Sequence, residues 1–280
     1  MIYHTGVNER AKGIIKNGLV YLLGDENQLY FPGEMFMARE ECDYGLIQFE
    51  VRGKWGFADI YTGEIKIPAT WEYAGPFYRG YAHVVAGAQL ERYGACHMES
   101  HGGKHGYIDR NGTIIIPIEY DAAEEIPYRQ FFKVAQNGKW GLIDNQNKIV
   151  IPFEWDILET SYYHDLVFCG IIEETCDPYV GPEDKLLESI FNIPAEPTSR
   201  RRLKWGGYDP NFNLIISPEL DHKPMPYKKK GKTNYHDRDS NYYLLKRKRK
   251  YGVLCKDGRL ITNITLLKRD ATNIIDKLSG

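Results

Sequence analysis

The 280-residue chain is 42% hydrophobic and 13% aromatic, which suffices for a buried core and excludes a disordered or fibrous protein. No run approaches the roughly 18 apolar residues of a membrane span, and the N-terminal residues lack the apolar core of a signal peptide. The five cysteines show no regular spacing and are expected to be reduced thiols. The sequence therefore predicts a cytoplasmic protein.

Residues 1–46 contain only a weak structural pattern. Leu19–Leu23 precedes a turn-forming GDENQ segment, and Leu29–Pro32 follows it, so that the order is strand, turn, strand and proline. A stronger form of this pattern recurs through residues 47–280. We interpret residues 1–46 as an N-terminal cap with a degenerate repeat, because the first unit of a stack meets water instead of a neighbour.

The stronger pattern begins at a lysine and is repeated five times along the chain. Its copies are KWGFADIYTGEIKIPATWE from Lys54, KHGYIDRNGTIIIPIEYD from Lys104, KWGLIDNQNKIVIPFEWD from Lys139, KWGGYDPNFNLIISPELD from Lys204 and KYGVLCKDGRLIT from Lys250. Each copy has two short segments rich in β-branched and aromatic residues around a turn, and a third such segment precedes the lysine. The sequence predicts three-stranded antiparallel β-meanders of at least 35 residues, the spacing from Lys104 to Lys139.

The recurring residues have a packing logic. We expect Trp55 and Trp140 to be buried against a neighbouring unit, and the glycine after each aromatic residue to let another backbone approach closely. Proline lacks an N–H, so we expect the prolines at positions 68, 117, 152 and 218 to end the strand ladder. A three-stranded unit cannot bury its apolar face alone, and tandem stacking would bury it.

This order of aromatic residue, glycine, acid, proline and second aromatic residue resembles the WG-repeat family, which is mainly bacterial. The resemblance implies a β-rich binding or scaffold module and supplies no set of catalytic residues. We therefore predict an all-β fold of tandem meanders in an open, twisted, solenoid-like array. A closed, propeller-like ring is the alternative.

Three insertions interrupt the array, at residues 90–103, 162–202 and 223–240. Within the second, residues 183–193 follow a proline, carry acids in the first turn and place four apolar residues on one face, which predicts a short helix. The first contains Cys96, His97 and His101, close to His105. We interpret these as surface residues and a packing histidine instead of metal ligands, because zinc sites usually show tighter pairs of ligands.

The basic residues are concentrated between Lys223 and Lys250, where eleven Lys and Arg accompany two acids. Candidate partner-binding residues in this region are Lys228, Lys229, Lys230, Lys232, Arg247, Lys248 and Arg249. Such a cluster attracts polyanions or an acidic protein surface, and lysines on an edge strand also discourage aggregation. Nucleic-acid or polyanion binding through residues 223–250 is therefore an alternative function.

No residue pattern indicates catalysis or a cofactor. The acids Asp109, Asp121, Asp144 and Asp156 recur once per copy at strand ends, where aspartate can accept bonds from turn backbone, so we interpret them as structural. The sequence predicts a non-enzymatic scaffold that uses its irregular insertions to bind or neutralise a protein partner, with neither metal nor cofactor.

Overall fold

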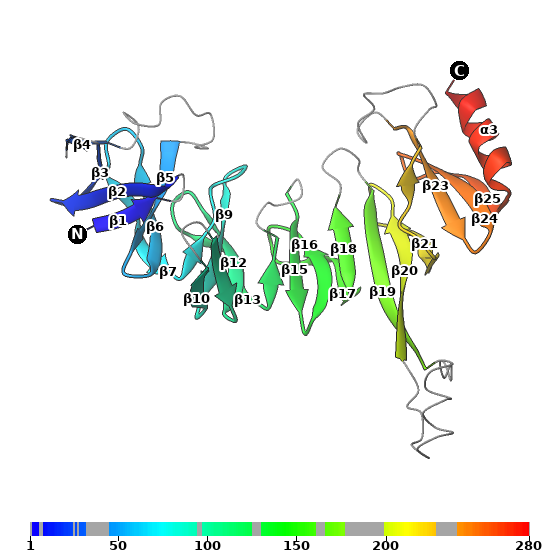
Figure 1. Ribbon diagram of the computed structural model, residues 1–280, viewed down its shortest axis with the longest axis horizontal. Coiled ribbons are helices and arrows are strands. Elements are labelled where there is room, and N and C mark those ends of the chain that lie inside the picture. Colours follow the sequence, from blue (N-terminus) through cyan, green and yellow to red (C-terminus); the bar gives the residue numbers. More distant parts are fainter. Residues whose placement is uncertain are drawn as a thin grey trace, which may run out of the picture. The chain divides into compact units, whose positions relative to one another are not determined.

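The computed structural model describes residues 2–5, 8–24, 26, 28–31, 45–93, 97–124, 130–160, 166–176, 199–227 and 240–279. In these ranges the chain forms antiparallel strands and one helix, α3 (Lys268–Leu278), which confirms the prediction of a mainly β protein built from tandem meanders (Figure 1). The chain divides into two compact units, Met1–Glu154 and Trp155–Gly280. The helix found in the described ranges is too short and too polar to cross a membrane.

The first sheet joins the N-terminal residues to the first strong copy of the repeat. Its order is β4-β3-β2-β1-β5-β6-β7. The strands are β1 (Ile2–Thr5), β2 (Asn8–Lys16), β3 (Leu19–Leu23), β4 (Leu29–Tyr30), β5 (Leu46–Val51), β6 (Lys54–Asp59) and β7 (Ile65–Trp71). The two parts are linked through β1 and β5, where His4 pairs with Glu50. The N-terminal strands are therefore continuous with the repeat sheet.

Each later copy lies in a four-stranded sheet. The second sheet contains β8 (Tyr73–Ala74), β9 (Tyr81–Ala86), β12 (Lys104–Asp109) and β13 (Ile114–Tyr120), and the third contains β14 (Ala122–Ala123), β15 (Phe132–Gln136), β16 (Lys139–Ile143) and β17 (Ile149–Trp155). The fourth contains β18 (Ile157–Thr160), β19 (Val167–Cys176), β20 (Ser199–Tyr208) and β21 (Leu214–Leu220), and the fifth contains β22 (Met225–Pro226), β23 (Tyr242–Arg247), β24 (Lys250–Cys255) and β25 (Leu260–Leu266).

The predicted three-stranded meander is present in each of these sheets, and one short strand is added to it. The added strand is two residues long in β8, β14 and β22 and four residues long in β18. One to four residues separate it from the last strand of the preceding sheet, so that β13 passes through Asp121 into β14. A strand of two residues is too short to produce a periodic sequence pattern.

In four copies, the strand that contains the aromatic residue and glycine pairs with the following strand through a β-bulge. In the first sheet Trp55 pairs with Trp71 and Phe57 with Ile67, so β7 uses two more residues than β6 across this interval. The same shift in register occurs where β12 pairs with β13, β20 with β21 and β24 with β25. The repeated sequence pattern therefore corresponds to a β-bulge that recurs in the strand pairing.

The glycine of the repeat lies against this bulge. A Cβ on Gly56 would lie 2.6 Å from the carbonyl oxygen of Ile67, and a Cβ on Gly206 would lie 2.5 Å from that of Ile216. No side chain fits at such a distance from backbone. The predicted reason for the glycine, close approach of another strand, agrees with this geometry.

The prolines lie inside the last strands of the sheets, so the prediction that they end the ladder was wrong. The strands β7, β13, β17 and β21 contain Pro68, Pro117, Pro152 and Pro218. All four are edge strands. A missing N–H is tolerated at a bulge or on the open side of an edge strand, where it would have no partner strand.

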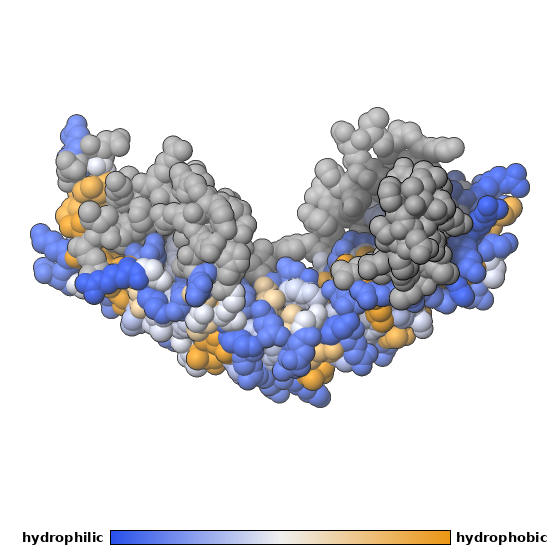
Figure 2. All heavy atoms as spheres, turned by 60° about the horizontal axis from the view of Figure 1, so that its bottom comes forward, coloured by the Kyte–Doolittle hydropathy of each residue, from blue (hydrophilic) through white to orange (hydrophobic). Residues whose placement is uncertain are grey.

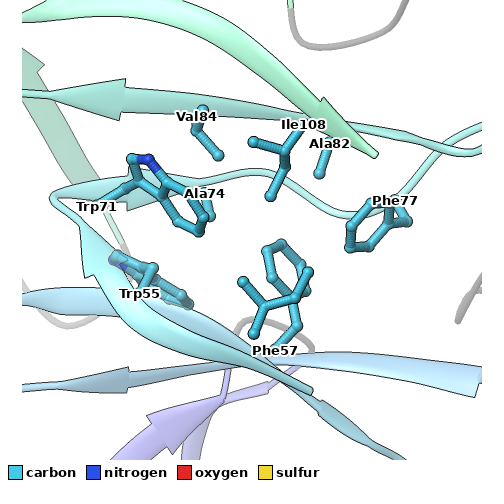
Figure 3. Close-up of a cluster of buried hydrophobic side chains, with 9 residues drawn as sticks. Trp55, Phe57, Trp71, Ala74, Phe77, Ala82, Val84 and Ile108 are labelled. Carbon is cyan, nitrogen blue, oxygen red and sulfur yellow. The ribbon is translucent and has the colours of Figure 1, made fainter. Parts of the chain in front are cut away.

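Neighbouring sheets bury their apolar faces against each other. Trp55, Phe57 and Trp71 of the first sheet meet Val84 and Ile108 of the second (Figure 3). The next cluster joins the second and third sheets and contains Tyr107, Ile116, Tyr120, Phe132, Val134 and Ile143. In the other unit, the fourth and fifth sheets share a core that contains Trp205. Stacking of the meanders within each unit thus buries the faces that a single sheet leaves exposed.

Trp140 differs from the other tryptophans at its position. Trp55 and Trp205 are 7% and 8% exposed, whereas Trp140 is only half-buried. The Nζ of Lys133 lies 4.5 Å from the centre of the Trp140 ring and covers it. The expectation of a buried Trp55 is confirmed and that of a buried Trp140 is wrong.

The insertions contain both described and undescribed residues. The first forms a hairpin of β10 (Gln89–Tyr93) and β11 (His97–His101). The helix predicted at 183–193 and the lysines 228–232 lie outside the described residues. The helix α3 was not predicted from the sequence, and its Ala271 and Ile275 pack on the fifth sheet through Leu244 and Val253.

Candidate partner-binding surface

The acid at the end of a copy of the motif forms hydrogen bonds both to the lysine of the same copy and to a backbone N–H of the following sheet. Asp121 accepts a hydrogen bond from Lys104 Nζ at 2.6 Å through Oδ1 and another from the backbone N–H of Asn137 at 2.6 Å through Oδ2. Asp221 does the same with Lys204 and with the backbone N–H of Lys248. These bonds lower the pKa of both carboxyl groups, with the lysine as the largest cause.

The acids within the hairpins have a separate structural role. Asp109 Oδ1 accepts the backbone N–H groups of Asn111 and Thr113 at 2.9 and 2.8 Å. Asp144 repeats this arrangement with Gln146 and Lys148. These carboxylates close the turns of their own hairpins, as expected from the sequence. Asp109 and Asp144 therefore each bond the turn of their own hairpin.

The described part of the basic region is a hairpin turn between β23 and β24. Arg247 Nη1 lies 2.6 Å from Glu219 Oε2, and Lys246 Nζ lies 3.1 Å from His222 Nε2. Lys248 has a positive φ of 53° and donates its backbone N–H to Asp221. Arg249 is exposed. Of the predicted partner-binding residues, Arg247, Lys248 and Arg249 are brought together here, while Lys228, Lys229, Lys230 and Lys232 lie outside the described residues.

Of the residues weighed as metal ligands in the first insertion, His97 and His101 lie at the two ends of β11, and Cys96 lies outside the described residues. Among the described side chains, no group of three or more His, Cys, Asp or Glu is placed to hold a metal ion. His105 instead faces His83 of β9. The distance from His83 Nε2 to His105 Nδ1 is 2.9 Å, and the rings are stacked with an interplanar angle of 13°.

A cleft of about 460 Å³ opens between the second and third sheets, and no sequence pattern had indicated it. Arg79, Tyr81, Gln130 and Phe131 line the cleft. Arg79 lies in the turn that precedes β9 and Tyr81 is the first residue of β9, while Gln130 and Phe131 come from the corresponding turn that precedes β15. The two turns have related sequences, Tyr-Arg-Gly-Tyr from position 78 and Tyr-Arg-Gln-Phe from position 128, and this internal similarity was the signal available in the sequence.

The first wall of the cleft has a defined geometry. The backbone groups of Tyr78 and Tyr81 bond to each other at 2.8 and 3.1 Å and hold Arg79 in a turn with a φ of 50°. The guanidinium carbon of Arg79 lies 5.4 Å from the centre of the Tyr78 ring. Tyr81 packs edge-on against Phe132, with ring centres 5.1 Å apart. A cation, phenol and amide groups and aromatic faces therefore surround one opening, a combination suited to an acidic or aromatic side chain.

Large aliphatic residues are exposed at one equivalent position in several sheets. Ile114 and Ile149 begin the edge strands β13 and β17 and are 53% and 55% exposed, and Leu214 and Leu260 begin β21 and β25. On the face drawn in Figure 2, hydrophobic residues form small separate groups among hydrophilic ones. Isolated exposed aliphatic residues are common on proteins and do not by themselves define an interface.

Comparison with known proteins identifies the repeat. Residues 55–87, 106–140 and 140–162 match the family described as WG containing repeat, and these segments coincide with the three strongest copies in the sequence. The chain is also similar to a solved structure described as "Crystal structure of the eukaryotic initiation factor", at 10% identity and a TM-score of 0.35, over 95% of this chain and 84% of that chain. A TM-score this low supports no conclusion about fold or function. None of the curated proteins matches. Three segments of this chain are therefore WG-containing repeats.

Proposed function

We propose that this protein is a non-enzymatic scaffold module that binds a protein partner, and that the partner docks at the cleft between the second and third sheets. The cleft is the observation that carries the proposal. Its residues come from turns of two successive repeats, so it exists only when the sheets are stacked. A binding site between repeat units is a common use of repeat architecture.

The use of the motif residues supports a scaffold role. The tryptophans, glycines and hairpin acids are engaged in packing, in the bulges and in turns, as described above. The turns at the cleft share an arginine, at positions 79 and 129, but have Gly80 and Tyr81 in one repeat and Gln130 and Phe131 in the next. Structural positions are thus repeated while the binding positions differ, which is how a scaffold becomes specific for one partner.

The partner chemistry that fits the cleft is an acidic segment with aromatic or aliphatic neighbours. Arg79 brings positive charge to the opening, and Tyr81 and Phe131 provide apolar faces beside it. Arginine and tyrosine are also enriched among the residues that dominate binding energy at protein interfaces. We place the protein in the cytoplasm, where the buried thiols of Cys169 and Cys255 would stay reduced.

Polyanion binding through residues 223–250 is the second candidate function. Its support is the local excess of basic residues, eleven Lys and Arg between positions 223 and 250. The described hairpin favours it less, because Arg247 is paired with Glu219 and Lys246 lies beside His222. Part of the positive charge is thus used within the fifth sheet and its surroundings.

The test is capture of binding proteins by the full chain and by two matched variants. We would purify complexes from the source cells at about 0.15 M salt, where non-specific charge attraction is screened. The variants are Arg79→Gln and Arg52→Gln. Arg52 is also exposed, has a φ of 55° and precedes a glycine, but it lies in the turn between β5 and β6.

The expected result is one protein that binds the unmodified chain and Arg52→Gln equally and loses at least about tenfold in affinity with Arg79→Gln, the usual effect of removing an interface hot spot. The affinities would be measured with the purified partner by calorimetry. Equal loss with both arginine variants, or no loss with Arg79→Gln, would contradict docking at the cleft.

A further inference from the structure

The residues that face each other across β9 and β12 in the second sheet have counterparts in the first and third sheets. His83 pairs in register with Tyr107, as Gln48 does with Phe57 and Lys133 with Leu142. Gln48, His83 and Lys133 each belong with the residue at the aromatic position of the motif on the neighbouring strand. The three pairs are Gln48 with Trp55, His83 with His105, and Lys133 with Trp140.

The three equivalent pairs satisfy their polar groups differently. Gln48 Nε2 donates to the carbonyl oxygen of Ala74 at 2.8 Å, and Lys133 Nζ lies over the ring of Trp140 and pairs with Glu124. His83 has only His105 as a polar partner at its Nε2, and its other nitrogen, Nδ1, is buried without a hydrogen bond. The second sheet therefore has two titratable rings where its neighbours have none.

The hydrogen bond between the two rings limits how many protons the pair can bind without an energetic cost. With both rings neutral, one of the two facing nitrogens carries a hydrogen and the other accepts it. In either tautomer, a charged His83 carries a hydrogen on its buried Nδ1, which has no acceptor. His83 is only 5% exposed, so the resulting imidazolium would also lose nearly all its hydration.

The surroundings of the pair do not compensate this cost. Tyr73 and Tyr107 lie beside His83, with ring centres at 5.7 and 5.5 Å. The charged groups that act on His105 are Lys104 and Asp121, and these pair with each other at 2.6 Å. Burial, with a smaller effect of His105, lowers the pKa of His83 from 6.5 to about 3, and burial also lowers the pKa of His105.

The pair lies at the joint between the second and third sheets. His83 shares a face of the second sheet with Tyr107, and Tyr107 packs on Phe132 of β15 with ring centres 4.6 Å apart. Tyr107 also donates its hydroxyl hydrogen to the carbonyl oxygen of Glu124. Phe132 directly follows Phe131, a residue of the cleft. Proton uptake by the pair would therefore disturb the packing that forms the cleft.

We propose that the His83–His105 pair is an acid-sensitive switch that loosens the joint between the second and third sheets when the pH falls below about 6.5 and releases whatever occupies the cleft. The release of a partner rests on the proposed function. The loosening of the joint does not, since it is a property of the free chain. The rings are neutral and the joint is closed at neutral pH, and uptake of one proton by the pair opens it.

The direction follows from linkage. The histidine pKa is lower in the folded joint than in the open one, so stability is complete above about pH 6.5 and falls as the pH is lowered toward 3. Between pH 7.5 and pH 5, His83 alone should raise the equilibrium constant for opening about 30-fold, because the open state gains the proton and the closed state does not.

The test is hydrogen exchange of the full free chain at pH 7.5 and pH 5, with protection factors corrected for the intrinsic effect of pH. The matched control is the double variant His83→Gln with His105→Trp, which introduces the residues found at Gln48 and Trp55. His83→Gln alone serves as the second variant, in case a tryptophan does not fit at position 105. Exchange at the imidazole C–H of His83 gives its pKa in the same samples.

We expect protection in β9, β12 and β15 to fall about 30-fold or more in the unmodified chain, and to change at least tenfold less in the double variant and in His83→Gln. An equal fall in all three proteins, or a pKa of His83 near 6.5, would overturn the proposal. If the joint opens with acid but the captured partner stays bound at pH 5, the switch stands and docking at the cleft is wrong.

Discussion

Lys204 Nζ lies 2.6 Å from Asp221 Oδ1, and the pair Lys104–Asp121 has the same separation in the other unit. Asp221 also accepts the backbone N–H of Lys248, from the turn of the following sheet. One carboxylate, directly after the end of β21, thus connects the middle of β20 with the turn between β23 and β24. The lysine and the acid that open and close the motif are partners in space.

Replacement of Asp221 by alanine should therefore destabilise the unit formed by Trp155–Gly280. We expect a loss of about 1–2 kcal/mol in the free energy of unfolding, because a charge-assisted bond to a backbone N–H is lost at a partly exposed site. Urea denaturation of the full chain would measure it. Glu219→Ala is the control, since Glu219 makes an exposed ion pair with Arg247 and should cost under about 0.5 kcal/mol. Equal effects of the two variants would contradict the special role of Asp221.

The glycines of the motif should differ in their tolerance of a methyl group. A Cβ at Gly206 would lie 2.5 Å from the carbonyl oxygen of Ile216, whereas a Cβ at Gly252 would lie 3.0 Å from that of Thr262. We expect Gly206→Ala to cost about 3 kcal/mol or more and Gly252→Ala about 1 kcal/mol, because the backbone at the tighter bulge must move further. Thermal unfolding of both variants would show the order, and a reversed order would exclude close approach as the reason for the glycine.

The tryptophans should also separate by burial. Trp55→Ala should cost about 3–5 kcal/mol through the cavity left between the first and second sheets. Trp140→Ala should cost about 1–2 kcal/mol, since Trp140 is half-buried and loses mainly its contact with the Lys133 cation. Denaturant unfolding followed by circular dichroism avoids the loss of fluorescence. If Trp140→Ala costs as much stability as Trp55→Ala, the half-buried side chain of Trp140 contributes more packing than its exposed area indicates.

The fold was predictable where a residue type is repeated at a fixed distance from the motif lysine. Trp55, Gly56 and Pro68 recur in order, and this order was enough to identify the meander and its stacking. What it did not reveal depends on pairing between strands. The role of Pro68 in a bulge follows from the register of Trp55 with Trp71, and register is not visible in a single strand.

The elements that were missed are short or weakly marked. The strand β14 is two residues long. The helix α3 buries only Ala271 and Ile275 and has Leu267 at its N-cap without a side-chain hydrogen bond, so the usual start signal is absent. The contact of His83 with His105 joins residues 22 positions apart, and the cleft is lined by Arg79 and Gln130 from separate repeats, which only the folded sheets bring together.

The left-handed backbone conformation of Lys248 allows one substitution to remove a positive charge and to relieve backbone strain. A lysine at a φ of 53° is strained, and asparagine, which occupies the left-handed position at Asn137, adopts this conformation more readily. We expect Lys248→Asn to stabilise the chain by about 0.5–1 kcal/mol while it removes one positive charge. Thermal unfolding would measure this. A loss of stability would show that the lysine side chain makes a contact worth more than the strain.

Nucleic-acid binding by residues 223–250 should be weak and should depend on salt. Each lysine or arginine that neutralises a phosphate releases condensed counterions, so affinity from charge alone falls steeply as salt rises. The described hairpin holds Arg247 against Glu219 and places Lys248 in a turn, and neither arrangement supplies a stacking platform for bases.

We therefore expect titrations with labelled single- and double-stranded oligonucleotides to show binding at about 0.02 M salt that disappears near 0.15 M, without preference for sequence. Joint replacement of Lys228, Lys229, Lys230 and Lys232 by glutamine should abolish this binding and leave the melting temperature unchanged, because this run of lysines is no part of the repeated motif. Arg79→Gln should leave it intact, since Arg79 lies in the cleft and outside the basic region. Tight binding that persists above about 0.2 M salt with a defined site size would make nucleic acid the partner and the scaffold proposal the weaker one.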